Sequence, residues 1–377
     1  MEVWIRQSMA YECLGDQPMP FPVPGRLWDR SLGESLYTDR MKFIRRVDQL
    51  GFDGLIFTEH HFGQNGGLTP SPVVMLAAAS QVTEQIKLVT MGVSLSAYDQ
   101  PVRLAEELAM IDNLSRGRLV LGLITSAAQS LFAFSIPVEH ERSRYHEAHD
   151  LMVRAWTEPD PFEWHGEHFN YDCVSILPRP LQQPHPPIWT TCSSEESLQW
   201  AAKNHFRLVA PGTTTQVSDI LTYYRHYAET ECGWSPTSAD FGMAREFFIA
   251  PRQEIADEVI AHLRDGDDES TSVNPRFRVP ELTKLLREQW STRTYDYGSR
   301  LGRPAGSGRT AGGYAGGFFL CGAPDAVTRQ IIEQREASGN PGVLVIRPEI
   351  GTMTLEEVGD GLELFAKEVL PVIRKLE

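Results

Sequence analysis

The stretch that decides the fold reads Gly51-Phe52-Asp53-Gly54-Leu55-Ile56-Phe57-Thr58-Glu59-His60-His61-Phe62. Its apolar run, Leu55 to Phe57, is typical of a strand covered on both faces, as in a parallel sheet. The run ends in a carboxylate and two imidazoles, and parallel α/β proteins place their reacting groups at the carboxyl ends of such strands. Because histidine changes charge near neutral pH, one of the pair is a candidate for proton transfer. The alternative is that both histidines are polar residues that close a strand.

Apolar runs of this kind recur along the chain and alternate with helical patterns. The eight strand-like runs are Val3 to Met9, Gly54 to Thr58, Ile86 to Leu95, Arg118 to Ile124, Pro187 to Thr191, Phe206 to Ala210, Met243 to Ala250 and Gly342 to Arg347. The helical patterns are Ser35 to Leu50, Ser71 to Gln81, Pro101 to Leu114, Arg142 to Trp156, Ser194 to Asn204, Val217 to Cys232, Pro324 to Ser338 and Leu355 to Lys375. This alternation predicts an α/β fold, a (β/α)₈ TIM barrel, with a doubly wound open sheet as the competing arrangement.

Two segments interrupt the alternation. Phe162 to Asp172 has a glycine between aromatic-rich arms and predicts a hairpin. Residues 265–317 form a long insertion with one expected helix, Glu281 to Trp290, and a glycine-rich tract. Such a tract has few apolar anchors, so we predict a mobile lid, the alternative being an insertion without a role. The whole chain, 1–377, is expected to be a single barrel domain.

Composition limits the classes of partner. Hydrophobic residues make up 41% and charged residues 23% of the 377 residues, as in ordinary globular proteins. The formal net charge of −15 disfavours nucleic acid and anionic membrane surfaces. Five cysteines without a C-x-x-C pair indicate neither a disulfide framework nor a structural zinc site. With no secretory signal and no membrane-spanning run in the sequence, we expect a cytoplasmic protein.

Several motifs follow Glu59-His60-His61-Phe62 in a definite order. They are Ser71-Pro72-Val73-Val74 to Ser80, Thr83-Glu84-Gln85-Ile86-Lys87-Leu88, Gln100-Pro101-Val102-Arg103 to Glu107, Met110 to Leu119, and Pro178-Arg179-Pro180-Leu181 to Pro187. In this order and spacing they resemble the bacterial luciferase-like, flavin-dependent monooxygenases. The resemblance also covers Phe318 to the C-terminus and leaves out only the long insertion and the residues before Ser35.

The resemblance implies a two-component monooxygenase that binds FMN. A separate flavin reductase would supply reduced FMN, which reacts with O₂ to form a flavin C4a-peroxide that oxygenates a small hydrophobic organic substrate, by hydroxylation or Baeyer–Villiger-type oxidation. No G-x-G-x-x-G opens a βαβ unit in the sequence, which agrees with a separate reductase. The alternatives are an F420-dependent oxidoreductase, which shares these motifs, and a non-catalytic flavin-binding protein. The family tends to form dimers, and the apolar helix Ser71 to Gln81 is the expected contact of a homodimer.

The resemblance also implies site residues. His60 matches the catalytic histidine, and a group with a pKa near ambient pH both delivers and withholds a proton efficiently. Glu59 and His61 are assigned to the cofactor site, where His61 would orient His60 or pack below the flavin. Gly92 and Val93 fall where relatives have a non-proline cis peptide under the flavin ring.

A second group of residues is expected to bind the FMN phosphate. Ser194 and Ser197 match the phosphate-contacting positions, and a helix start with free N–H groups binds phosphate well. Plain N-capping is the alternative. Many relatives have an arginine just after the fourth strand, where this chain has Thr125, so Arg142 or Arg144 is expected to compensate, unless both are simply solvated.

Two further sets of side chains have less specific interpretations. His140, His146 and His149 are expected to form a solvated helix face rather than a metal site, because no carboxylate or cysteine completes a zinc pattern. Aromatic residues expected to line a substrate cavity, or to belong to the core, are Trp4, Trp28, Phe62, Phe132, Phe134 and Tyr314.

Overall fold

The computed structural model describes residues 1–7, 9, 11, 22–63, 67–126, 128–265, 319–349 and 353–376, without the side chains of 128, 129 and 260–265. The predicted insertion at 265–317 therefore lies outside the described residues, apart from the backbone of Asp265.

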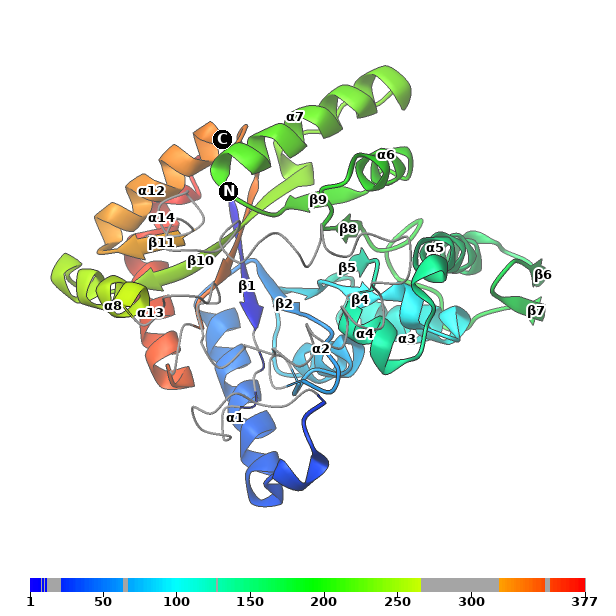
Figure 1. Cartoon of the computed structure of the whole chain (residues 1–377), viewed down its shortest axis with the longest axis horizontal. Coiled ribbons are helices and arrows are strands. Elements are labelled where there is room, and N and C mark those ends of the chain that lie inside the picture. Colours follow the sequence, from blue (N-terminus) through cyan, green and yellow to red (C-terminus); the bar gives the residue numbers. More distant parts are fainter. Residues whose placement is uncertain are drawn as a thin grey trace.

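Eight parallel strands form a closed ring (Figure 1). They are β1 (Glu2–Gln7), β2 (Gly54–Phe57), β3 (Lys87–Thr90), β5 (Leu119–Ile124), β8 (Ile188–Thr190), β9 (Arg207–Ala210), β10 (Phe241–Ile249) and β12 (Val343–Arg347). Each strand pairs with the next, and the ring closes because β10 pairs with both β9 and β12, and β12 with β1. The TIM-barrel prediction is confirmed, and the open sheet is wrong.

Helices surround this ring (Figure 1). They are α1 (Arg30–Gln49), α2 (Pro72–Ser80), α3 (Pro101–Leu114), α4 (Ala128–Ala133), α5 (Glu141–Thr157), α6 (Glu195–Lys203), α7 (Thr214–Glu231), α8 (Gln253–Asp265), α12 (Pro324–Ala337), α13 (Leu355–Glu368) and α14 (Leu370–Ile373). Helix starts follow local chemistry: the Ser71 hydroxyl accepts a hydrogen bond from the backbone N–H of Val74, and Pro72 occupies the first helical position. The predicted helices outside the insertion are present with ends shifted by a few residues, and the expected helix Glu281 to Trp290 lies outside the described residues. Helices α4 and α8 were not predicted.

Large side chains fill the barrel interior. Trp4 on β1 and Trp189 on β8 meet edge to face with ring centroids 4.8 Å apart, in a buried cluster with valines from the neighbouring strands. Gly54 makes room for this packing, because a Cβ there would lie 2.5 Å from the Trp4 ring. Trp4 is therefore a core residue and does not line a cavity at the rim.

Three local features differ from or extend the sequence predictions. The expected strand Ile86 to Leu95 is split into β3 and the short β4 (Val93–Ser94), and the non-proline cis peptide joins Met91 to Gly92. The prediction of a cis bond between Gly92 and Val93 is therefore wrong by one residue. An extra strand, β11 (Phe319–Gly322), was not predicted and pairs with the second half of β10. The predicted hairpin is present as β6 (Phe162–His165) and β7 (Asn170–Val174).

Gly92 fits tightly at the break between β3 and β4. A Cβ there would lie 2.6 Å from Cγ2 of Ile124 on β5, closer than side-chain atoms approach each other. The absence of a side chain, rather than freedom of the backbone, is what this position requires. Among the described helices, none has the length and apolarity that a membrane crossing needs.

Candidate functional site

The Glu59-His60-His61 segment directly follows β2, at the carboxyl end of the barrel. Glu59 is buried, and its carboxylate lies 3.1 Å from Nε2 of His61. The same carboxylate accepts hydrogen bonds from the Tyr98 hydroxyl at 3.2 Å and from the backbone N–H of Ser94 at 3.3 Å. With these three partners, Glu59 favours the His61 tautomer that carries a proton on Nε2 and fixes the ring orientation.

Tyr98 supports this arrangement from the loop after β4. Burial, followed by the adjacent Glu59 carboxylate, raises the pKa of Tyr98, so the phenol stays protonated and donates to Glu59. The loop itself is held by Arg144 of α5, whose Nε donates to the Ser96 carbonyl at 2.8 Å and whose Nη2 donates to the Tyr98 carbonyl at 3.1 Å. Arg144 therefore has a structural role in the loop, which leaves Arg142 as the arginine proposed for the phosphate.

His60 has a strongly perturbed environment. Burial, followed by the positive charge of Arg6 on β1 and by His61, lowers the pKa of His60 to about 4. Its backbone N–H donates to the Thr69 carbonyl at 3.2 Å, which anchors the segment after β2. This pKa lies below the ambient range that the sequence analysis expected, and the catalytic role of His60 stays a prediction. At neutral pH His60 is an uncharged imidazole that can accept a proton or a hydrogen bond.

The residues expected to bind phosphate meet at the start of α6. Ser194 is the N-cap residue of this helix, but its hydroxyl donates to Oγ of Ser197 at 2.8 Å and makes no capping hydrogen bond. Simple N-capping therefore does not account for these two serines. Arg142 reaches across from α5 and forms an ion pair with Glu196 in the first turn of α6. A cation, two hydroxyls and a helix N-terminus thus lie together, which is a donor set suited to a phosphate.

The remaining predicted cofactor residues lie on neighbouring strand ends. Val93 is fully buried in β4 and pairs with Leu123 of β5, next to Gly92. Thr125 follows β5 and is partly exposed, and β5 pairs with β8, the strand that leads to Ser194. These positions share one rim of the barrel, and their contacts with a flavin stay a prediction.

Aromatic side chains adjoin the imidazole pair. His61 packs edge-on against Phe134, with ring centroids 4.6 Å apart, and lies 6.3 Å from the ring of Phe62. Both phenylalanines are largely exposed to solvent. They provide apolar surface beside the imidazoles. Tyr314, also expected near the cavity, lies outside the described residues.

The three histidines of the α5 region do not form a solvated face, so that prediction is wrong. His146 stacks on Trp200 of α6 with centroids 4.3 Å apart, and buried His149 packs against Trp200 and Phe206. His140 precedes α5, in a short 3₁₀ helix (Val138–His140), and lies near His168 of the hairpin instead. Helical spacing alone did not reveal the packing of α6 against α5.

Sequence reasoning missed Tyr98 and the serines around it. Ser96 and Ser126 hydrogen-bond each other through their hydroxyls at 2.9 Å, and Ser94 donates to Ser130 at 3.3 Å. The available signal was the pair Ser94 and Ser96 within an otherwise apolar run. Buried hydroxyls require partners, so such a pair indicates a polar network at the strand end.

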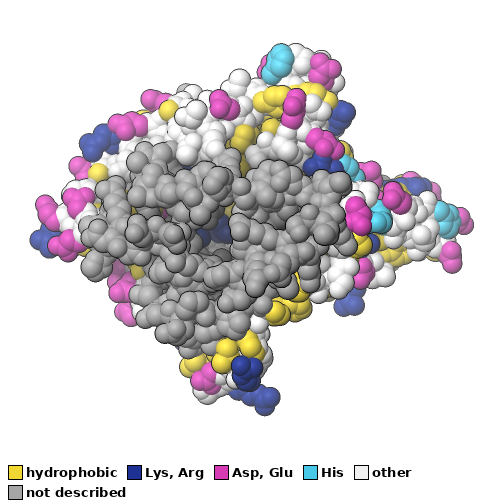
Figure 2. All heavy atoms as spheres, in the orientation of Figure 1, with side chains coloured by type: hydrophobic (Ala, Val, Ile, Leu, Met, Phe, Trp, Pro, Cys, Tyr) yellow, Lys and Arg dark blue, Asp and Glu magenta, His cyan; other side chains and the backbone are white. Residues whose placement is uncertain are grey.

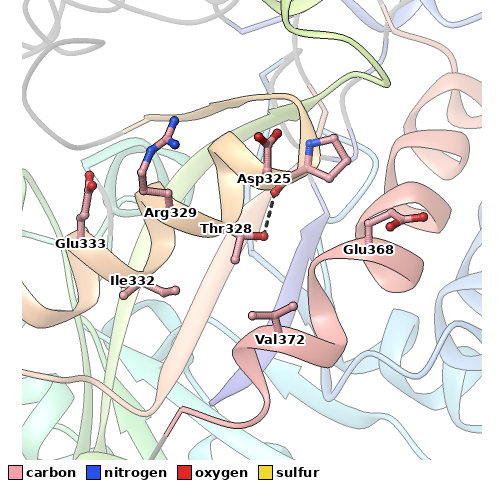
Figure 3. A pocket seen from close by; sticks show the side chains of 8 residues that line it. Asp325, Thr328, Arg329, Ile332, Glu333, Glu368 and Val372 are labelled. Atoms are coloured by element: carbon pink, nitrogen blue, oxygen red, sulfur yellow. Dashed lines mark hydrogen bonds between the residues drawn. The ribbon is translucent and has the colours of Figure 1, made fainter.

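A groove on the outer wall lies apart from these strand ends. Figure 3 shows it between α12 and the C-terminal helices, with residues of α12 on one side and Glu368 and Val372 on the other. Its lining residues are Pro324, Asp325, Thr328, Arg329, Ile332, Glu333, Glu368 and Val372. It contains none of the predicted site residues and is not a candidate for the flavin site.

Curated relatives match about half of the chain. The chain is 34% identical over 190 residues to the uncharacterized protein y4wF of Sinorhizobium fredii, covering 50% of this chain and 55% of that protein. It is 28% identical over 182 residues to the oxygenase component of the flavin-dependent trigonelline monooxygenase of Acinetobacter baylyi, covering 48% and 49% of the two chains. The chain thus spans about half the length of the curated relatives it matches.

Solved structures match over nearly the whole chain. Monooxygenase RslO1 of Streptomyces bottropensis has a TM-score of 0.76 at 25% identity and 99% coverage of both chains. The oxygenating constituent of 3,6-diketocamphane monooxygenase of Pseudomonas putida, in complex with FMN, has a TM-score of 0.71 at 19% identity, with 97% and 98% coverage. An F420-dependent secondary alcohol dehydrogenase has a TM-score of 0.68 at 15% identity and 99% coverage of both chains. At such low identity, the matches to this dehydrogenase and to the 3,6-diketocamphane monooxygenase show the fold alone.

Fold and site together define a (β/α)₈ barrel with an imidazole pair at the end of its second strand. The family model for luciferase-like monooxygenases matches residues 23–340. The chain therefore belongs to the luciferase-like monooxygenase family.

Proposed function

We propose that this chain is the oxygenase component of a two-component FMN-dependent monooxygenase. The observation that carries the proposal is the pairing of two sites on one barrel rim: the Glu59-anchored histidines, and the phosphate-type donor set of Arg142, Ser194 and Ser197. The named relative from Acinetobacter baylyi, an oxygenase component, supports a separate reductase.

Reduced FMN, when bound, supplies the two electrons that activate O₂, so that one oxygen atom enters the substrate and the other leaves as water. In this scheme Arg142, Ser194 and Ser197 bind the phosphate, and Glu59 holds His61 in place. His60, uncharged at neutral pH, accepts a proton or a hydrogen bond at the reacting centre. Glu59, Gly92, Val93 and Thr125 are proposed to adjoin the cofactor.

The substrate is proposed to be a small hydrophobic organic molecule. The exposed rings of Phe62 and Phe134 beside His61 support this, because they offer apolar surface where the reaction would occur. Both hydroxylation and Baeyer–Villiger oxidation fit these residues. An aliphatic ketone, which would report Baeyer–Villiger oxidation, and an aromatic compound, which would report hydroxylation, are the substrate classes to test in parallel.

We further propose a homodimer that forms through α2 and α3. Val74 on α2 is apolar but 66% exposed, whereas most residues of this helix are buried. Met110 and Leu114 on the adjacent α3 are also exposed. Together these side chains form an apolar surface of the kind that subunit interfaces cover.

Two measurements test the enzyme proposal. Quenching of flavin fluorescence should show binding of FMN, and stopped-flow absorbance should show that the protein slows the reoxidation of reduced FMN by O₂ relative to free flavin. His60→Ala should change the reoxidation time course and leave the Kd for FMN within about twofold.

F420 is the competing cofactor, favoured by the shared fold of the F420-dependent dehydrogenase. Parallel titrations with FMN and F420 separate the two possibilities. Tight binding of F420, together with reoxidation of reduced FMN at the rate of free flavin, would refute the monooxygenase proposal.

A further inference from the structure

One carboxylate of α5, that of Glu147, accepts three hydrogen bonds from the β6–β7 hairpin. Figure 1 shows the hairpin beside α5, at the end of the molecule opposite α8. Glu147 of α5 accepts hydrogen bonds from Nε1 of Trp164 at 3.1 Å, from the backbone N–H of Phe169 at 3.0 Å and from the backbone N–H of His168 at 2.8 Å. A Cβ on Gly166 would overlap Oε1 of Glu147, so the turn needs glycine to approach this closely.

This anchoring brings three metal-ligating side chains together. His140, at the start of α5, and Glu167 and His168, in the hairpin turn, each have a ligand atom within 4.8 Å of the others. Nε2 of His168 lies 3.6 Å from Oε1 of Glu167, and the two imidazole rings have centroids 5.2 Å apart. Figure 2 shows histidine and acidic side chains close together at this end of the molecule.

We propose that His140, Glu167 and His168 form a binding site for a divalent transition metal of the Zn²⁺ type. Two imidazoles and one carboxylate are a ligand set that Zn²⁺ accepts, with a fourth position left to water. Bonds of about 2.0 to 2.2 Å in a tetrahedron separate the ligand atoms by roughly 3.4 Å. The ligand atoms, which lie at most 4.8 Å apart, therefore need to close by no more than about 1.4 Å, and the pair formed by Glu167 and His168 is already at 3.6 Å.

The burial of the ligands differs, and the exposed one has more room to adjust to a metal. The His168 side chain is 6% exposed and is held in place through its backbone, whereas the Glu167 side chain is 71% exposed and free to rotate inward. The Ser143 hydroxyl forms a hydrogen bond with Nε2 of His168 at 2.7 Å, on the nitrogen that would bind the metal. With a cation present, this hydroxyl can instead hydrogen-bond a metal-bound water or the carboxylate, as neighbouring groups of metal ligands commonly do.

The site has a structural consequence that is independent of the flavin reaction. It connects the hairpin turn to the first turn of α5, which also carries Arg142. Because the metal binds the folded arrangement of ligands and not the unfolded chain, binding should raise the unfolding temperature of the full chain.

The experiment uses the full-length protein stripped of metal with a chelator. Titration calorimetry with ZnCl₂ should show one saturable site per chain, and Co²⁺ should develop visible absorption bands on the same site. His140→Gln and Glu167→Gln should each weaken Zn²⁺ binding by about tenfold or more. Glu167→Gln carries little folding risk, since the side chain is exposed.

His165→Gln is the matched control. His165 lies in the same hairpin, and its Nε2 is 3.4 Å from Oε2 of Glu163, but it does not belong to the three-residue group. Its substitution should leave Zn²⁺ affinity unchanged. Absence of saturable binding, equal binding by wild type and both ligand variants, or an equal loss in His165→Gln would each overturn the proposal.

Discussion

Replacing Arg142 with methionine tests the proposed phosphate site without disturbing the imidazole pair. Methionine keeps an unbranched side chain on α5 but removes the positive charge that faces the start of α6. FMN should bind more weakly to this variant. Riboflavin, which has the same ring system but no phosphate, should bind as it does to wild type.

The expected size of the effect follows from the exposure of the side chain. A hydrogen bond between charged groups contributes roughly 1.5 to 3 kcal/mol. Arg142 is 29% exposed, so solvent and salt reduce this to about 1 to 2 kcal/mol. The Kd for FMN should therefore rise by about 5- to 30-fold, since 1.4 kcal/mol corresponds to a factor of ten.

Substitution of Glu196 should change the affinity for FMN in the opposite direction. Its carboxylate forms an ion pair with Arg142, and this pair must separate when a phosphate binds to the arginine. An exposed ion pair of this kind contributes about 0.2 to 1 kcal/mol, so Glu196→Gln should lower the Kd for FMN by up to about fivefold.

The assay is quenching of flavin fluorescence, at fixed ionic strength, for FMN and riboflavin in parallel. Arg103→Met is the matched control, because Arg103 is an exposed arginine on α3 that pairs with Glu107 one helical turn away. The reasoning is refuted if Arg142→Met weakens FMN and riboflavin equally, or leaves the affinity for both unchanged.

Three further outcomes follow from the structure. Gly92→Ala should cost about 1 to 3 kcal/mol, because the new methyl group meets Ile124, and should lower Tm in scanning calorimetry by roughly 1 to 4 °C. An unchanged Tm would contradict that packing. His60 binds a proton in the unfolded chain below about pH 6.5 but in the folded protein only near pH 4, so the free energy of unfolding should fall as pH drops through this range. The fall should be smaller in His60→Gln than in wild type. Identical pH profiles of stability for the two proteins would argue against the lowered pKa. Val74→Glu should convert the proposed dimer to a monomer in light scattering, and a variant that stays dimeric would place the interface elsewhere.

Much of the fold could be predicted because its signals are local. The apolar run Leu55 to Phe57, the Ser71-Pro72 helix start and the hairpin at Phe162 to Asp172 each depend on a few adjacent residues. The strands that were predicted wrongly or not at all also have local causes. The run Ile86 to Leu95 contains a break that apolar composition does not reveal, and Phe319 to Gly322 is too short to distinguish from a loop.

The candidate site was predicted unevenly for the same reason. Glu59 and the two histidines stand at a strand end, where a sequence pattern can locate them. The partners of Glu59 could not be found this way, because Tyr98 lies 39 residues away and reaches the carboxylate only through the packing of β2 beside β3.

The sequence by itself determined the alternation of strands and helices, because each element forms from residues that are neighbours along the chain. The tertiary structure decided that the strands close into a ring, in which β10 pairs with both β9 and β12. Only the tertiary structure decided which side chains meet: Arg142 of α5 with Glu196 of α6, and His140 before α5 with His168 of the hairpin. It also decided the protonation of His60, since burial and the charge of Arg6 depend on strands that lie far apart in sequence. Electrostatics and burial act through space, and short-range sequence patterns do not contain those distances.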